Sequence, residues 1–262
     1  MTTVGFLGVG RMGSALISAF CDKKLVAKKD VLAYDPRPEA AKELNIQAAE
    51  NEAELVRKSD VVFLCVKPQT MEAALSAIKK ESGGKLFVSI AAGITTGYIE
   101  GRLDKAARVI RVMPNTPAMV GLLAAGYAKG KRATTEDTDY VKKLLTGIGV
   151  ATEVPEDQLD AITGLSGSGP AYAYQFIEAI AKAGEKQGLS YSESLKLAAQ
   201  TTKGAAEMIL STGKTPKELT DMVASPGGTT IEGLKVLTQS DFSKIVGDTV
   251  AAATKRSKEL RR

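Results

Sequence analysis

The sequence has no histidine, no tryptophan and only two cysteines among its 262 residues. Without histidine, a His general base, a His-activated nucleophile and a His-ligated metal are all excluded. Cys21 and Cys65 fall in an expected helix and an expected strand, so they indicate neither a disulfide framework nor a zinc site, and they are typical of a reducing cytoplasm. We therefore expect no metal, and chemistry that depends on hydroxyls, Lys, Asp or Glu, backbone dipoles or a cofactor.

Aromatic residues are also few, with seven Tyr and six Phe, which argues against a stacking platform for nucleic-acid bases. The net charge of +5 is dispersed except near the chain end, where cations complement the dipole of a final helix. No apolar run reaches membrane-spanning length, and a strand from Val4 leaves no room for a signal peptide. We expect a cytoplasmic protein that binds neither nucleic acid nor a membrane.

The first half of the chain alternates short apolar strands with helical segments, a pattern typical of a parallel sheet covered on both faces. From about residues 150–160 onward the sequence indicates only Ala-rich helices, with capping boxes at Ser190/Glu193 and Thr215/Glu218. Such small-residue helices make a modest core, so we expect this half to pack against a second copy. The expected strands are 4–8, 31–34, 46–48, 61–66, 86–90 and 109–112; the expected helices include 14–20, 40–44, 52–58, 71–79, 98–103, 171–186, 190–211 and 241–260.

A glycine-rich motif follows the first expected strand. Gly8-Val9-Gly10-Arg11-Met12-Gly13 is G-x-G-x-x-G opening a helix, and Asp35 ends the second strand 22 residues after Gly13. In that context the motif predicts a pyrophosphate site, with the acid on the adenosine ribose; the alternative is a glycine-rich turn in a domain that binds nothing. The sequence thus predicts an α/β fold: a doubly wound, mainly parallel Rossmann domain over residues 1–154, followed by an all-α dimerisation domain over residues 155–262.

Two further strand ends lie at the same edge of the predicted sheet. Lys67-Pro68 follows one strand and Asn115-Thr116 follows another, and ligands of open α/β sheets bind beyond the carboxyl ends of the strands. Because prolines also simply terminate strands, a functional and a structural role for Lys67 and Asn115 both stay open.

The stretch from Ser225 to Thr230, with the sequence SPGGTT, separates two helical patterns. Its glycines permit close backbone approach, and the amides at the next helix start present a positive cradle to an anion. Alternatively the segment is a plain corner, in which Thr229 is the N-cap and Glu232 completes a capping box.

These segments together resemble pyrroline-5-carboxylate reductases, the enzymes of the last step of proline synthesis. GFLGVGRMGSAL, FLCVKP, AAGIT, RVMPNTP, TGLSGSGPAY and VASPGGTTIEGL occur in the family's order over essentially the whole chain. The resemblance implies an NAD(P)H-dependent oxidoreductase that reduces the cyclic imine 1-pyrroline-5-carboxylate to L-proline. It also implies a homo-oligomer, either a dimer or a decamer of five dimers.

The resemblance assigns roles to particular residues. Ser225, Gly227, Gly228 and Thr229 would bind the substrate carboxylate, while the Thr230 hydroxyl would meet the imine nitrogen as the catalytic side chain. Residues 166–170 would shape the domain junction, or else form a glycine-rich helix start. The implied cofactor contacts are Leu7, Gly8, Val9, Gly10, Arg11, Met12, Asp35, Asn51, Cys65, Val66, Lys67, Pro68, Asn115 and Thr116.

Asp35 departs from the family pattern, because many members have a small hydroxyl residue there, suited to the 2′-phosphate of NADP. A carboxylate repels that phosphate and favours the free ribose diol of NAD, although Arg37 partly offsets the repulsion.

Two rival functions also stay open. A β-hydroxyacid dehydrogenase begins with a similar sequence but carries a Lys one turn beyond a glycine-rich segment, whereas here the first Lys after Gly169 is Lys182. The other rival is a non-catalytic dinucleotide-sensing regulator.

Overall fold

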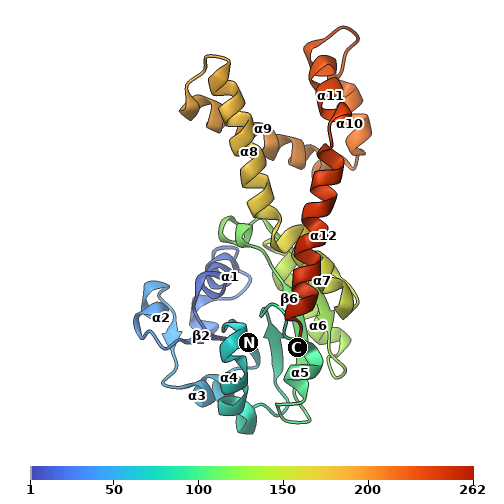
Figure 1. Cartoon of the computed structure of the whole chain (residues 1–262). Coiled ribbons are helices and arrows are strands. Elements are labelled where there is room, and N and C mark those ends of the chain that lie inside the picture. The colour runs from blue at the N-terminus through green and yellow to red at the C-terminus, as the bar shows by residue number, and fades with distance from the viewer. Residues whose placement is uncertain (1) are drawn as a thin grey trace. The chain divides into compact units, whose positions relative to one another are not determined.

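The computed structural model describes residues 2–262 and divides into two compact units. The first, the sheet unit, contains the chain up to Ser168 together with Val250–Arg262. The second, the helical unit, is Gly169–Thr249. Each unit is shown in Figure 1, coloured along the chain. No helix within residues 2–262 combines the length and the apolar character needed to cross a lipid bilayer.

The described part of the sheet unit contains an eight-stranded sheet of order β3-β2-β1-β4-β5-β6-β7-β8. Neighbouring strands are parallel except β6 and β7, which are antiparallel. The first six strands follow the order 3-2-1-4-5-6 of a dinucleotide-binding Rossmann fold, which confirms the predicted fold class. The strands are β1 (Val4–Leu7), β2 (Val31–Tyr34), β3 (Gln47–Ala48), β4 (Val61–Leu64), β5 (Leu86–Ser89), β6 (Arg108–Met113), β7 (Leu123–Lys129) and β8 (Gly149–Glu153).

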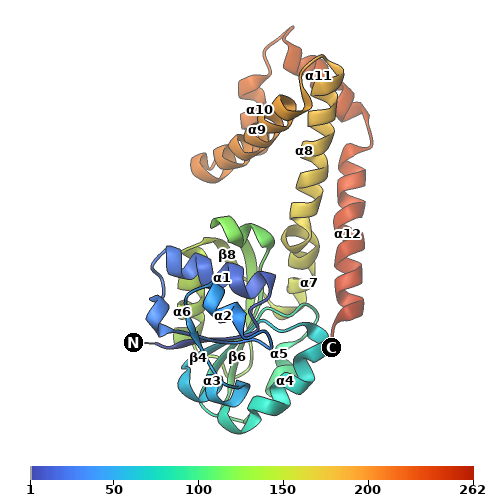
Figure 2. The same cartoon turned by 90° about the vertical axis from the view of Figure 1, so that its left-hand side faces the viewer.

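Two hydrophobic cores cover the two faces of this sheet. Alternate strand residues enter alternate cores: Phe6 and Phe63 join one, with ring centroids 4.9 Å apart, while Leu7 and Leu64 join the other. This explains why the strands are continuously apolar. Figure 2 shows α1 and α6 on one side and α3, α4 and α5 on the other. The helices are α1 (Arg11–Asp22), α2 (Glu39–Glu43), α3 (Glu52–Lys58), α4 (Met71–Ile78), α5 (Thr96–Glu100), α6 (Thr135–Thr146) and α7 (Leu159–Ile162).

The predicted elements in the first half are present, with ends that differ by at most three residues. Three elements were missed: β7, α6 and β8. Strand β7 reads LAAGYAK and has no β-branched residue, so its composition gives little strand signal. Helix α6 carries a full capping box between Thr134 and Asp137, a signal that was available in the sequence.

The helical unit contains α8 (Gly169–Lys186), α9 (Tyr191–Thr212), α10 (Pro216–Val223), α11 (Thr229–Gln239) and the start of α12 (Phe242–Leu260), whose later turns belong to the sheet unit. The capping box at Thr215 and Glu218 is complete. At Ser190 only half is formed: Ser190 Oγ accepts from the Glu193 amide, but the Glu193 carboxylate accepts from the Ser190 hydroxyl instead of its backbone.

The helical unit buries almost none of its own apolar surface. Among the described residues of this unit, only Ala181, Ser194 and Ala198 are buried. Large apolar side chains are left exposed over every helix, including Tyr174, Leu197, Leu210, Met222, Val223, Val236 and Ile245. An uncovered apolar surface of this extent is typical of a protein interface.

Candidate functional site

A cleft of about 600 Å³ opens at the carboxyl ends of β1, β2 and β4. This is the topological switch point of the sheet, because β1 lies between β2 and β4 while the chain order runs outward on both sides. The cleft is lined by Leu7, Gly8, Gly10, Arg11, Tyr34, Asp35, Pro36, Arg37, Glu52, Cys65, Val66, Lys67, Thr70, Ala73 and Ala74.

The three motif glycines have three different geometric reasons to be glycine. Gly8 has a φ of +100°, which L side chains rarely adopt, and a Cβ there would lie 3.0 Å from the Cys65 carbonyl oxygen. A Cβ on Gly13 would overlap the Gly8 carbonyl oxygen, so α1 packs directly on the loop before it. A Cβ on Gly10 would meet no atom within 4 Å. The space above Gly10 is therefore free for a ligand to approach the backbone.

The amino end of α1 is suited to an anion. Within the described residues, no side chain caps this helix at Gly10 and its first turn contains no acidic residue. The first amides of a helix have no intrahelical acceptor and add to the positive end of the helix dipole. A pyrophosphate placed above Gly10 would receive these donors.

We expect Gly10→Ala to weaken cofactor binding and Gly13→Ala to lower stability. Gly10→Ala should leave folding unchanged and weaken NADH binding by about five-fold, because its methyl occupies only ligand space. Gly13→Ala should lower the melting temperature, because its methyl overlaps backbone. Thermal unfolding and fluorescence titration with NADH separate the two effects. A Gly10→Ala protein that binds NADH like the parent would place the pyrophosphate elsewhere.

Asp35 and Arg37 hold the peptide of Val9 inside the glycine motif. Asp35 Oδ2 accepts from the Val9 amide at 2.7 Å, and Arg37 Nη2 donates to the Val9 carbonyl at 3.1 Å. Asp35 Oδ1 also accepts from the Arg37 amide at 3.0 Å and lies 3.3 Å from Arg37 Nε. The carboxylate therefore lies in the cleft and links the end of β2 to the glycine motif.

Eight of the predicted cofactor residues line this cleft, namely Leu7, Gly8, Gly10, Arg11, Asp35, Cys65, Val66 and Lys67. Val9, Met12, Asn51, Pro68, Asn115 and Thr116 are not part of its lining. The cleft is also lined by residues that the sequence did not indicate, namely Tyr34, Pro36, Glu52, Thr70, Ala73 and Ala74. Tyr34 is the last residue of β2 and Pro36 follows Asp35, so their position at a strand end is the signal that would have found them.

Two of the predicted residues have local structural partners. Asn51 is the N-cap of α3, where its Oδ1 accepts from the Glu54 amide at 2.9 Å. Asn115 is buried beyond the end of β6 and uses both ends of its amide: Nδ2 donates to the Ser166 carbonyl at 3.1 Å, and Oδ1 accepts from the Ala124 amide at 3.0 Å. Asn115 thus holds three chain segments together at the sheet edge where the cofactor cleft opens.

Cys65 follows β4 and packs against the glycine loop, where its amide donates to the Leu7 carbonyl at 2.9 Å. Burial raises the pKa of the Cys65 thiol well above its ordinary value. The thiol is therefore neutral at physiological pH and behaves as a small apolar wall of the cleft.

The Ser225–Thr230 turn lies in the helical unit. Gly227 has a φ of +72°, and the Gly228 amide closes the turn by donating to the Ser225 carbonyl at 3.0 Å. A Cβ on Gly228 would lie 2.6 Å from the Ser225 hydroxyl, so only glycine lets that side chain lie over the turn. Within residues 2–262, the Ser225, Thr229 and Thr230 hydroxyls have no hydrogen-bond partner, although those of other threonines do.

The alternative in which Thr229 is an N-cap is wrong. Helix α11 has Gly228 as its N-cap with no side-chain hydrogen bond, and Thr229 is the first helical residue. Glu232 does not return to the helix start, because its carboxylate pairs with Lys235 at 2.7 Å. The extended conformation that a cap requires falls on Gly228, and this leaves both threonine hydroxyls available to a ligand.

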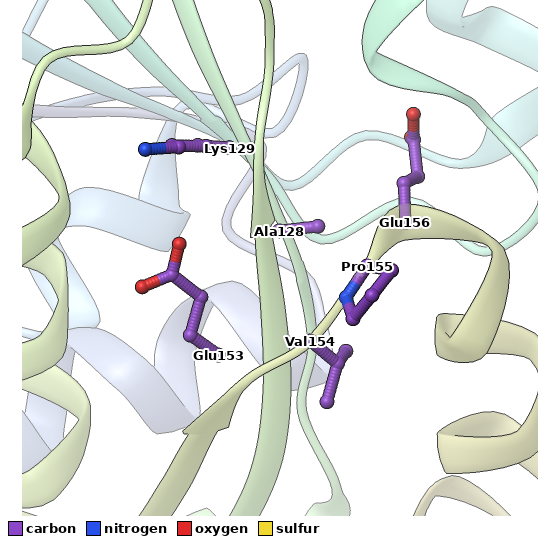
Figure 3. Close-up of a pocket in the computed structure, with 6 residues that line it drawn as sticks. All are labelled: Ala128, Lys129, Glu153, Val154, Pro155 and Glu156. Carbon is purple, nitrogen blue, oxygen red and sulfur yellow. The ribbon is translucent and has the colours of Figure 1, made fainter.

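A second hollow of about 310 Å³ lies where β8 ends beside β7. In Figure 3 the side chains of Lys129 and Glu153 point to one side of the β7 strand and that of Glu156 to the other. Its charged groups thus do not converge on a common ligand. Within residues 2–262, no group of three Cys, Asp or Glu side chains is arranged to hold a metal.

Two family models each match one part of the chain, and several known proteins match nearly its whole length. A family described as pyrroline-5-carboxylate reductase dimerisation matches residues 156–260, and one described as NADP oxidoreductase, coenzyme F420-dependent, matches residues 3–93. The pyrroline-5-carboxylate reductase of Methanosarcina acetivorans is 43% identical over an alignment of 262 positions, which covers 98% of this chain and 97% of that protein. That of Escherichia coli is 36% identical over the same shares of the two chains.

Solved structures agree over the full length. The pyrroline-5-carboxylate reductase of Coxiella burnetii superposes with a TM-score of 0.94 at 29% identity, covering 100% of this chain and 99% of that one. The Plasmodium falciparum pyrroline carboxylate reductase, solved with NADP bound, gives a TM-score of 0.88 at 33% identity, covering 100% and 98%.

Proposed function

The chain belongs to the pyrroline-5-carboxylate reductase family, and from this premise we propose how its residues carry out the reaction. It is an NAD(P)H-dependent oxidoreductase: a hydride passes from the nicotinamide to the C=N carbon of 1-pyrroline-5-carboxylate, and the product is L-proline. This is the last step of proline biosynthesis. The observation that carries the assignment is the 43% identity to the Methanosarcina acetivorans enzyme over nearly the whole chain. We further propose that the enzyme works in the cytoplasm.

The reaction suits a protein without histidine. A protonated cyclic imine is already electrophilic at carbon, so it needs no imidazole base. The cofactor supplies the hydride, and the protein must orient the two rings, hold the substrate carboxylate and offer a hydroxyl at the nitrogen. A β-hydroxyacid dehydrogenase would instead need the active-site lysine that this chain lacks at the corresponding place.

The sheet sets the direction in which the cofactor lies. In this proposal the adenosine and pyrophosphate lie over β2 and β1, which is supported by Asp35 at the end of β2 and by the open backbone at Gly10. The nicotinamide would then extend over β4 and β5 toward the end of β6, which Asn115 and Thr116 follow. Three strand spacings from β1 to β6 amount to about 14 Å, a span that an extended dinucleotide covers.

The Ser225–Thr230 turn is the proposed substrate site. The Gly227 and Thr229 amides, with the Ser225 hydroxyl, would hold the carboxylate at the amino end of α11. The Gly228 amide already closes the turn, so its contribution is to shape this cradle. The Thr230 hydroxyl, half-buried and without a partner in the described structure, would meet the ring nitrogen.

We propose that the turn of one chain serves the cofactor of a second chain. The helical unit leaves its apolar side chains uncovered, and residues 156–260 match a dimerisation family. The protein is accordingly a homo-oligomer, and a decamer built from five such dimers is the finer form of this proposal.

Sedimentation with assay of the separated species tests the shared site. We expect activity only in dimers or larger assemblies. One variant combines Gly10→Ala with Asp35→Ala, which weaken the cofactor site, and another combines Thr230→Val with Ser225→Ala, which weaken the substrate site. Mixing the two should restore part of the lost activity, because hybrid dimers contain one intact site. A fully active monomer would refute the idea.

The activity itself is tested by following nicotinamide oxidation with 1-pyrroline-5-carboxylate, using NADH and NADPH in parallel. Turnover that depends on the imine is the expected result. Binding of the dinucleotide without turnover would instead support a regulator that has kept the fold. The intact Ser225–Thr230 segment favours the enzyme.

A further inference from the structure

A buried carboxylate in the sheet unit has no place in the chemistry described so far. Asp160 lies on the short helix α7 and is fully buried, with 0% of its surface exposed. Burying a carboxylate costs several kcal/mol unless it is paired and hydrogen-bonded. The groups that pair with Asp160 therefore show which contact offsets the cost of burying this carboxylate.

Both partners of Asp160 come from the end of α12, about a hundred residues later. Ser257 Oγ donates to Asp160 Oδ1 at 2.7 Å, and Ser257 is itself buried. Arg261 Nη1 lies 3.3 Å from Asp160 Oδ2. Next to these contacts, the Arg262 amide donates to the Gly93 carbonyl at 2.7 Å. The end of α12 is thus joined to the rest of the sheet unit by this carboxylate and by the backbone of Arg262.

Helix α7 runs directly into a turn of π-helix, η6 (Thr163–Gly167). A Cβ on Gly164 in this turn would overlap Thr254 Oγ1 and lie 2.8 Å from the Val250 carbonyl oxygen, so the π-helix packs with its backbone against α12. Its Ser166 carbonyl is the acceptor for Asn115 Nδ2 at 3.1 Å. A continuous path of contacts thus joins α12, α7, the π-helix and Asn115. Single π-turns are frequent at functional sites.

We propose that Asp160 is a positioning residue for hydride transfer. With Ser257 and Arg261 it holds α12 against α7 and the π-helix, and the π-helix in turn sets Asn115 at the end of β6. This rests on the proposed function, in which the nicotinamide lies beside Asn115. A small displacement of Asn115 changes the distance and angle between the hydride donor and acceptor, and the rate of hydride transfer is sensitive to both. The adenosine end of the cofactor is unaffected.

The start of this segment has a separate anchor. Glu156, in η5 (Glu156–Gln158) just before α7, accepts from the Thr96 amide and the Thr96 hydroxyl, both at 2.7 Å. It also lies 3.5 Å from Nη1 of the buried Arg111. Because these contacts remain when Asp160 is replaced, the substitution loosens the far end of the segment and leaves its start in place.

The test compares Asp160→Ala and Asp160→Asn with Asp157→Asn. Asp157 is exposed three residues earlier and serves as the matched control. Asp160→Ala should lower kcat by about five-fold while the Kd for NADH and the KM for the imine stay within about two-fold. Asp160→Asn keeps an oxygen for Ser257, so it should recover part of the loss. An Asp160→Ala protein that is folded and turns over like the parent overturns the proposal, as does an equal loss in kcat and in NADH affinity.

Two further measurements keep the test decisive. Ser257→Ala removes one partner without creating a buried space, so it carries the test if Asp160→Ala does not fold; an unchanged kcat in it refutes the proposal. The fluorescence of enzyme-bound NADH reports the nicotinamide ring without turnover, and we expect it to shift in the Asp160 variants but not in Asp157→Asn. If the parent does not reduce the imine, the proposed function fails, and this fluorescence still decides the role of Asp160.

A double-mutant cycle identifies the route of the effect. In an Asn115→Ala background, Asp160→Ala should cost little further turnover, because the group that it positions is gone. Independent effects on kcat would show that Asp160 acts elsewhere, which contradicts the proposal.

Discussion

Thr230→Val should lower turnover by about ten- to hundred-fold, equivalent to roughly 1.4–2.8 kcal/mol in the activation free energy. Valine keeps the shape and β-branching of threonine, and the hydroxyl it removes has no partner within the described structure. That hydroxyl is the group proposed to meet the ring nitrogen, whose bonding changes as hydride arrives. Losing an interaction that strengthens in the transition state lowers kcat and kcat/KM together. Steady-state kinetics with saturating NADH measure both constants.

Two neighbouring substitutions serve as controls for Thr230. Ser225→Ala should raise KM with kcat nearly unchanged, because a carboxylate contact is made in the ground state and the transition state alike. Thr229→Val should change neither the kinetics nor the stability much, since Thr229 is the exposed first residue of α11 and caps nothing. If Thr229 proves critical while Thr230→Val reacts like the parent, the two hydroxyl roles are reversed.

Asp35→Ser should shift cofactor preference toward NADPH by about ten-fold or more, equivalent to roughly 1.4–2 kcal/mol. Only 13% of the Asp35 side chain is exposed, so a 2′-phosphate beside it meets like charge in a partly desolvated groove. The parent is expected to prefer NADH. The measured quantity is the ratio of kcat/KM for NADPH to that for NADH. A parent that already prefers NADPH strongly, with a ratio that the substitution leaves unchanged, would contradict this.

The Asp35 contact with the Val9 amide calls for a second variant. Asp35→Ser also removes the acceptor for that amide, so affinity for both cofactors should fall while their ratio moves. Asp35→Asn retains an oxygen for Val9 and removes only the charge. A shift in the ratio that is similar in the two variants assigns the preference to charge, whereas a shift confined to Asp35→Ser assigns it to the loop.

The order of the predicted elements came from the sequence because each strand ends in a distinct signal, such as the glycines after β1 or the proline after Lys67. The region from Leu123 to Glu153 lacked such signals in its strands. Leu123–Lys129 is rich in Ala and Gly, and it forms a strand because β6 and β8 pair with it on both sides. This is tertiary pairing that overrides weak local propensity.

The site residues also differ in whether local sequence or distant contacts determine their position. Residues identified by backbone geometry, such as Gly8 and Gly10, lie in the cleft, because a glycine requirement is local. The role of Asn115 was left open, and its partners at Ser166 and Ala124 are distant in sequence or on an unpredicted strand. The N-cap at Gly228 was missed because a hydroxyl residue at Thr229 is the commoner cap. The sequence around Asp160 does not indicate its role, since its partners Ser257 and Arg261 lie about a hundred residues later.

The discontinuous sheet unit has a consequence for biosynthesis. Ribosomes deliver the chain from its amino end, and domains fold as they emerge. The first 168 residues contain the whole sheet, yet the turns of α12 that complete this unit are translated only after the helical unit. Until then the Asp160 carboxylate lacks its serine and arginine partners. We therefore expect the sheet unit to be completed only after the helical unit has been translated.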